Sequence, residues 1–178
     1  MEENTRKLAE IAMGIALSLV LNFLVLFRMP QGGSVTIAML PIFIIAFRWG
    51  FSAGVLTGVG SGLLQLAFGA YIVHPVQLVL DYPLAYGLVG VAGIFRSQIH
   101  NLDHKAQYLW IFLAMVSGAL IRFLAHILSG VIFFSDLAPE GQNVWLYSII
   151  YNGSFLLPAL LLCLVVIVPM KSLIIERN

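Results

Sequence analysis

Asp81 is a carboxylate within the apolar residues 76–86, in a chain of which 10% of the residues are charged and 61% are hydrophobic. An ionisable side chain in hydrocarbon costs about 2.5 to 3.5 kcal/mol on insertion scales, so such residues usually mark functional sites and have an identifiable partner. Arg122, in the apolar residues 108–134, is one candidate partner of opposite charge, and a cationic ligand is the other. The pairing of Asp81 is therefore the first chemical question that the sequence raises.

Several polar and aromatic residues could act together with Asp81. His126, Gly130 and Phe134 are spaced at i, i+4 and i+8, which places them on one face of a helix. Aromatic rings give cation–π contacts, and imidazole and amide groups hydrogen-bond ring nitrogens or hydroxyls. A single tyrosine more often belongs to the interfacial belt of a membrane protein, but the whole set favours a pocket for a small cationic heteroaromatic ligand. The set comprises Asp81, Tyr82, His126, Gly130, Phe134, Tyr147 and Asn152.

The chain that must position these residues is that of an integral membrane protein. Its mean hydropathy is +1.00, whereas soluble domains average about 45–50% apolar and about 25% charged residues. A spanning helix needs about 20 mainly apolar residues, and six apolar segments alternate here with short polar or Gly/Pro-containing stretches. We therefore predict an all-α fold with six transmembrane helices in a single domain, residues 1–178. The predicted spans, of which the second is short enough to be tilted or partly re-entrant, are residues 8–27, 35–47, 51–69, 76–95, 108–134 and 144–170.

The distribution of Lys and Arg predicts the orientation, because these residues are enriched in cytoplasmic loops. With the N- and C-termini in the cytoplasm, Arg28 is the outer exception and Arg122 lies within a span. Asp81 and its candidate partners on the last two helices then share the outer half of the membrane, so we expect their pocket to open to the exterior. The basic residues placed in the cytoplasm are Arg6, Lys7, Arg48, Arg96, Lys105, Lys171 and Arg177.

Two further groups of residues allow both a functional and a structural interpretation. Arg122 lies one turn from His126, and a structural ion pair or contacts with backbone carbonyls are favoured over a role at the pocket floor. His100 and His104 have an i, i+4 spacing that metal ligands also use, but with Asp103 they are expected in a solvated loop. No metal or cofactor is therefore expected.

The rest of the chain argues against an enzyme or a nucleic-acid-binding protein. No Walker motif, HExxH or Gly-x-Ser-x-Gly setting is present, and a net charge of +1 without a basic patch does not suit phosphate binding. Cys163 is expected to be a packing residue. Ala12 and Ala16 form a small-xxx-small pattern, which permits close helix approach within the protein or to another membrane protein. Without an ATP site, a chain that holds a ligand needs ion coupling or an energising partner to concentrate it.

Four segments resemble one family of membrane proteins. They are residues 31–41 (QGGSVTIAMLP), 70–86 (AYIVHPVQLVLDYPLAY), 126–134 (HILSGVIFF) and 145–152 (WLYSIIYN). The sequence is similar in these segments to the thiamine-specific substrate-binding subunits (S-components) of energy-coupling factor (ECF) vitamin transporters. The resemblance extends over nearly the whole chain, and six helices with a short second segment agree with it.

This resemblance implies a multi-pass protein of the bacterial cell membrane that captures thiamine outside the cell. Its partners would be thiamine, the lipid bilayer, a transmembrane coupling protein and two ATPase subunits. The resemblance assigns Ala12 and Ala16 to the interface with the coupling protein. It also adds Tyr71 to the binding residues, which become Tyr71, Asp81, Tyr82, His126, Gly130, Phe134, Tyr147 and Asn152.

The sequence departs from that family at the two ends of the proposed charge contact. The family has Glu where this chain has Asp81, and Trp where it has Phe134, so the carboxylate reaches one methylene less far and the ring is a weaker cation–π partner. The thiazolium of thiamine would supply the cation for Asp81. Two alternatives stay open: an S-component for another vitamin, and an ion-coupled carrier or intramembrane enzyme in which Asp81 and His126 exchange protons.

Overall fold

Six helical segments make up most of the chain in a computed structural model that describes residues 2–30 and 32–175. Three of these segments are long and apolar enough to cross a membrane, namely Pro75–Asn101, Lys105–Phe133 and Val144–Ser172. The predicted all-α class is confirmed, with one short hairpin added. The elements outside the fourth segment are α1 (Glu2–Phe23), β1 (Phe27–Arg28), β2 (Ser34–Val35), α2 (Leu40–Trp49), α3 (Phe51–Leu66), α7 (His104–Phe133), η3 (Ser135–Leu137) and α8 (Val144–Ile175).

The fourth segment is one continuous helix whose hydrogen-bonding pattern changes along its length. It consists of α4 (Pro75–Val79), the π-helical turn η1 (Leu80–Leu84), α5 (Ala85–Val89), the 3₁₀ turns η2 (Gly90–Phe95) and α6 (Arg96–Asn101). Pro83 lies inside the π turn, and a proline has no N–H for a regular helical bond. Single π turns within α-helices often occur at functional sites, and Asp81 belongs to this one.

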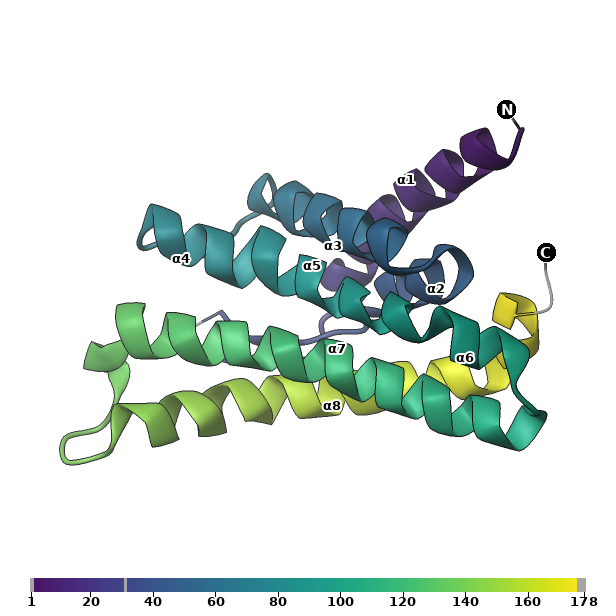
Figure 1. The fold of residues 1–178 in the computed structure, drawn as a ribbon. Coiled ribbons are helices and arrows are strands. Elements are labelled where there is room, and N and C mark those ends of the chain that lie inside the picture. The colour runs from purple at the N-terminus through teal and green to yellow at the C-terminus, as the bar shows by residue number, and fades with distance from the viewer. Residues whose placement is uncertain (1, 31, 176–178) are drawn as a thin grey trace.

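The helices form a bundle with two distinct ends (Figure 1). The start of α1, the end of α8 and the α6–α7 connection lie at one end, which we call the terminal end. The start of α4 and the connection between α7 and α8 lie at the other, which we call the cavity end. The segment α4–α6 runs between α3 and α7, and α8 packs along α7. That arrangement brings residues 75–86, 122–134 and 144–155 to the cavity end.

All six helical segments differ from their predicted bounds at one or both ends, and two of these differences make room for a hairpin. The first ends at Phe23 rather than at residue 27, and the second begins at Leu40 rather than at residue 35. Between them, β1 and β2 pair as an antiparallel hairpin with Phe27 opposite Val35. Pro41 lies in the first turn of α2, a position where the missing N–H has no helical partner to lose. The polar hairpin therefore replaces the start of the predicted second span.

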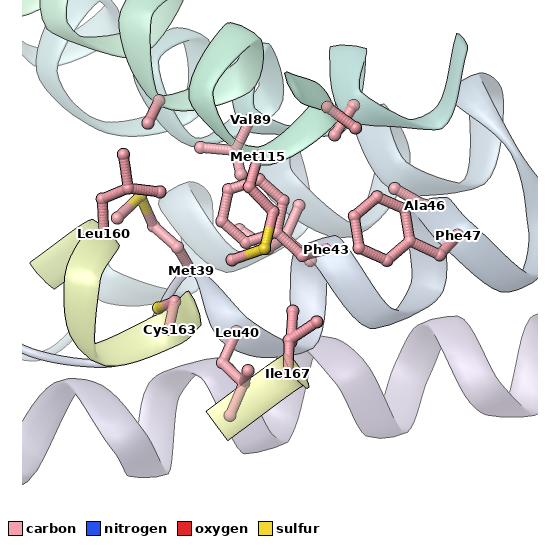
Figure 2. Packing of buried hydrophobic residues seen from close by; sticks show 14 of the residues in the cluster. Met39, Leu40, Phe43, Ala46, Phe47, Val89, Met115, Leu160, Cys163 and Ile167 are labelled. Atoms are coloured by element: carbon pink, nitrogen blue, oxygen red, sulfur yellow. The ribbon is translucent and has the colours of Figure 1, made fainter. Parts of the chain in front are cut away.

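The apolar core surrounds α2 in the half of the bundle toward the terminal end. Phe43 and Phe47 are fully buried and stack with ring centroids 6.2 Å apart. Figure 2 shows them beside Met115 of α7 and Val89 of α5, with Leu160, Cys163 and Ile167 of α8 in the same cluster. Cys163 is fully buried there, as expected of a packing residue. The core thus joins the helices from which the cavity is built.

Close backbone contact holds α3 against the α4–α6 segment. A side chain at Gly58 would collide with the backbone of Tyr86, and one at Gly62 would collide with the backbone of Tyr82. Small residues allow membrane helices to approach in this way. The contact fixes α3 beside the turn that carries Asp81.

Candidate functional site

A cavity of about 360 Å³ lies among the residues of the cavity end. Its volume falls within the range of about 300 to 1,000 Å³ that is typical of small-molecule sites. All the residues predicted to bind a ligand line this cavity, although they belong to different segments of the chain. They are Tyr71, Asp81, Tyr82, His126, Gly130, Phe134, Tyr147 and Asn152.

The carboxylate of Asp81 is held by hydrogen bonds on both oxygens. Gln77 Nε2 donates to Oδ2 at 2.7 Å, and Ser129 Oγ donates to the same atom at 2.8 Å. His126 Nδ1 lies 2.9 Å from Oδ1. Gln77 is one helical turn before Asp81, whereas the other two partners come from α7. Because charged hydrogen bonds are short and directional, this arrangement fixes the carboxylate before any ligand arrives.

His126 connects Asp81 to Arg122 instead of leaving them in direct contact. Arg122 Nε donates to His126 Nε2 at 3.2 Å, so Nε2 carries a lone pair. The ring proton then belongs to Nδ1, which donates to Asp81. Arg122 also lies over the ring of Tyr86, with its guanidinium carbon 3.9 Å from the ring centroid. Among the described residues no ion pair joins Arg122 to Asp81 directly.

The partners predicted for Arg122 differ from those in the structure. The sequence predicted an ion pair or backbone carbonyls, and the structure gives an imidazole and a tyrosine ring. Arg122 is only 7% exposed but still lines the cavity. Arg122 thus contacts other side chains of the protein and also lines the cavity.

The loop before α4 covers one side of the cavity and is tied to the same residues. The backbone N–H of Tyr71 donates to the hydroxyl of Tyr82 at 2.7 Å, and the ring of Tyr71 stacks on Phe134 with centroids 6.0 Å apart. Gln77 accepts from the N–H of Val73 at 3.1 Å and donates to the carbonyl of Tyr71 at 3.1 Å. Gln77 therefore links this loop to the Asp81 carboxylate.

Aromatic residues of α8 hold the hairpin over another side. Tyr151 accepts a hydrogen bond at its hydroxyl from the N–H of Gly33, at 3.1 Å, and stacks on Tyr147 with centroids 6.1 Å apart. A side chain at Gly33 would collide with the ring of Phe155. The hairpin can lie this close to α8 because a glycine occupies that position.

Asn152 and Gly130 bring α7 and α8 together beside the cavity. Asn152 Nδ2 donates to the carbonyl of Ser148 at 2.9 Å and lies 3.3 Å from the carbonyl of His126. A side chain at Gly130 would collide with the hydroxyl of Ser148. The amide nitrogen of Asn152 is thus engaged within the protein, which leaves its carbonyl oxygen to accept a bond from a ligand.

Comparison with known proteins decides the family. Residues 8–176 match the family described as thiamine transporter protein (Thia_YuaJ). The chain belongs to this thiamine transporter family. It is 40% identical to the thiamine transporter ThiT of Bacillus subtilis (strain 168) over 168 residues, which cover 90% of this chain and 88% of that protein. It is also 31% identical to the thiamine transporter ThiT of Lacticaseibacillus paracasei over 137 residues, 72% of this chain and 68% of that protein.

A solved structure supports the same assignment. The structure of ThiT from Listeria monocytogenes superposes with a TM-score of 0.88 at 31% identity and covers 96% of each chain. The resemblance noted from the sequence is therefore confirmed at the level of the thiamine transporter family. As a member of that family, the chain is a multi-pass protein of the bacterial membrane.

The cavity has more polar lining residues than the sequence predicted. Gln77 and Ser129 hydrogen-bond Asp81, while Gln65 of α3 and Tyr151 of α8 also line the cavity. Helical periodicity could have found two of them, because Gln77 lies at i−4 from Asp81 and Ser129 at i+3 from His126. No comparable periodic signal marks Gln65, which lies in the span predicted for residues 51–69.

The terminal end corrects one expectation and leaves others open. His100 does not lie in a solvated loop, because it belongs to α6 and its Nε2 lies 2.9 Å from the carbonyl oxygen of Phe47. The side chain of His104 and the whole of Arg177 lie outside the described residues. Among the described residues no group of three or more His, Cys, Asp and Glu could hold a metal ion. Ala12 and Ala16 are exposed on α1, so they do not serve internal packing.

Proposed function

We propose that this chain is the thiamine-binding subunit of an ECF-type importer, with its cavity open to the exterior. The observation that carries the proposal is the Asp81 carboxylate, which lines the cavity and is oriented by Gln77, Ser129 and His126. Its bonds use three of the roughly four acceptor positions of a carboxylate, so one position on Oδ1 remains for a ligand. Thiamine carries a permanent cation in its thiazolium ring, which suits that position.

The aromatic rings around the carboxylate support the same ligand. Tyr71 and Phe134 form one stacked pair at the cavity, and Tyr147 and Tyr151 form another. Ring faces attract cations within about 6 Å of the ring centroid, and they also stack on heteroaromatic rings. A ligand with a cationic ring and a neutral pyrimidine uses both properties, whereas a vitamin without a fixed cation leaves Asp81 without a charge partner.

Asp81→Asn tests the proposed ligand. We expect thiamine affinity to fall by roughly two to four orders of magnitude, because removing one partner of a buried charge pair costs about 3 to 5 kcal/mol. An uncharged pyrimidine analogue should lose far less. Titration of the purified protein, followed by intrinsic fluorescence and calorimetry, measures both. Equal losses for the two ligands would remove the electrostatic role, and absence of saturable thiamine binding by the unaltered protein would exclude the ligand.

Transport would require partners outside this chain. We propose a transmembrane coupling protein and two ATPase subunits, with Ala12 and Ala16 on the docking face. Both alanines are exposed on α1, although exposure alone does not identify the partner. Ala12→Trp should abolish uptake by the assembled transporter while leaving thiamine binding intact. Leu120→Trp, at an exposed position on α7, is the matched control and should preserve both.

One observation favours a second candidate, an ion-coupled carrier that acts alone. Asp81 and His126 lie 2.9 Å apart, which is a suitable distance for proton exchange. Proteoliposomes that contain only this chain distinguish the two functions. Uptake driven by an ion gradient would establish the carrier, whereas strict dependence on added ATPase and coupling subunits would establish the importer.

A further inference from the structure

One buried polar group at the cavity is left without a partner. Gln65, on α3, lines the cavity and is 6% exposed. Its Nε2 has no hydrogen-bond partner. Among the described residues, no other buried side-chain nitrogen or oxygen lacks one. Buried polar groups in native proteins are nearly always paired, so an exception at a cavity calls for an explanation.

The polar neighbours of Gln65 on α3 do not provide the missing bond. The hydroxyl of Ser61 donates to the carbonyl of Thr57 at 2.7 Å, and that of Thr57 donates to the carbonyl of Ala53 at 2.8 Å. These hydroxyls donate within the helix, and neither of their oxygens accepts a hydrogen bond from Gln65 Nε2. Gly62, three residues before Gln65, packs against the backbone of Tyr82, so this face of α3 is held beside the turn that carries Asp81.

Reversing the amide does not remove the problem. The oxygen and nitrogen of a glutamine side chain are assigned from their partners, and the buried position assigned to Nε2 has no partner within the described residues. Exchanging the two atoms would leave the carbonyl oxygen unpaired instead. A ligand hydroxyl can donate and accept, and it therefore satisfies this amide in either orientation.

The arrangement of the helices indicates which end of a ligand meets Gln65. The segment that carries Asp81 runs between α3 and α7 (Figure 1). On the α7–α8 side, Asn152 has a carbonyl oxygen left over, which suits a ligand amino group. On the α3 side lies the unpaired amide of Gln65. With the thiazolium at Asp81, the aminopyrimidine would point toward α8 and the hydroxyethyl arm toward α3.

We propose that Gln65 binds the hydroxyl group at the end of the hydroxyethyl arm of thiamine. This inference rests on the proposed function, because it takes thiamine as the ligand. It makes Gln65 a specificity-determining residue that no helical pattern around Asp81 or His126 would reveal. It also makes α3 a contributor to ligand recognition, in addition to its packing role.

The test compares thiamine with an analogue in which ethyl replaces hydroxyethyl. Gln65→Met removes the amide and keeps a flexible side chain of similar length. We expect this variant to bind thiamine about 5- to 10-fold more weakly, as is typical for the loss of one hydrogen bond, and to bind the ethyl analogue with unchanged affinity. Calorimetric titration of the purified full chain measures both. Ser61→Ala, one turn away and outside the cavity lining, is the control and should change neither affinity.

Stability supplies a second readout. Because Gln65→Met removes an unpaired buried group, the ligand-free variant should melt at the same temperature as the unaltered protein or higher. Gln65→Asn keeps the amide but shortens it, and it should show an intermediate loss for thiamine alone. An equal loss for thiamine and the ethyl analogue, or no loss for either, would overturn the contact. Failure of the unaltered protein to bind thiamine would instead overturn the proposed function, and this contact with it.

Discussion

The two halves of α7 face the interior with different side chains. Toward the terminal end the helix contributes Ile111, Ala114 and Met115 to the apolar core. Toward the cavity end the same helix contributes Arg122, His126 and Ser129 to the cavity. The backbone is one uninterrupted helix from His104 to Phe133. A packing region and a binding region therefore share their architecture and differ in the inward-facing side chains.

The two halves of α7 contribute to different properties of the protein. The core half fills its interior with apolar atoms and should supply most of the folding free energy, because burial of apolar surface is the dominant favourable term. The cavity half leaves space and fixes polar groups around it. Substitutions in the two halves should therefore change different measured quantities.

Phe43→Ala should have the largest effect on stability. Phe43, on α2, is fully buried beside Met115 of α7 and Val89 of α5, and truncating a buried phenylalanine costs about 3 to 5 kcal/mol of unfolding free energy. Denaturant-induced unfolding in detergent measures this loss. Phe112→Ala, at an exposed position on α7, is the control and should cost much less. If thiamine affinity of the folded variant fell as steeply as its stability, the division between the halves would be wrong.

Gln77→Leu should have the next largest effect, this time on ligand affinity. The variant removes a charged hydrogen bond of 2.7 Å to Asp81 and the links to Tyr71 and Val73. We expect thiamine affinity to fall by roughly tenfold or more, since bonds to charged groups are worth about 1.5 to 3 kcal/mol. Gln107→Leu, at the terminal end of the bundle, is the control and should leave the affinity unchanged. A Gln77 variant with full affinity would show that the carboxylate does not need this support.

Tyr151→Phe should have the smallest effect. It keeps the ring that stacks on Tyr147 and removes the hydroxyl that accepts from the N–H of Gly33. One neutral hydrogen bond is worth about 1 kcal/mol, so we expect a loss of a few-fold in affinity, measured as faster thiamine dissociation in stopped-flow fluorescence. Tyr108→Phe, at the terminal end, is the matched control. An unchanged dissociation rate would indicate that the hairpin does not restrain the ligand.

The sequence predicted the depth and the helix face of the residues around the cavity. Helical spacing placed His126, Gly130 and Phe134 together, and the order of the spans brought them to the level of Asp81. Those inferences need only the rise and the period of a helix, which hold in membrane helices as in soluble ones. Their roles as ligand contacts remain predictions, although all of them line one cavity.

The parts that the sequence did not predict depend on irregular backbone and on long-range contacts. The second span was predicted to begin at residue 35, because residues 35–39 are as apolar as α2. In the structure these residues are not helical, and Val35 pairs with Phe27 in the hairpin. Gln65 was not among the predicted site residues, since a single amide gives no periodic signal. The chain of contacts from Asp81 through His126 to Arg122 could not be found by looking for a direct ion pair.

The short second helix has a consequence for permeation. Ten residues, Leu40 to Trp49, rise about 15 Å, at about 1.5 Å per residue, which is roughly half of a hydrocarbon layer of about 30 Å. By its own length, α2 therefore crosses only about half of such a layer. The packed layer around Phe43 and Phe47 lies between the cavity and the terminal end, so a solute in the cavity would still have to cross that layer.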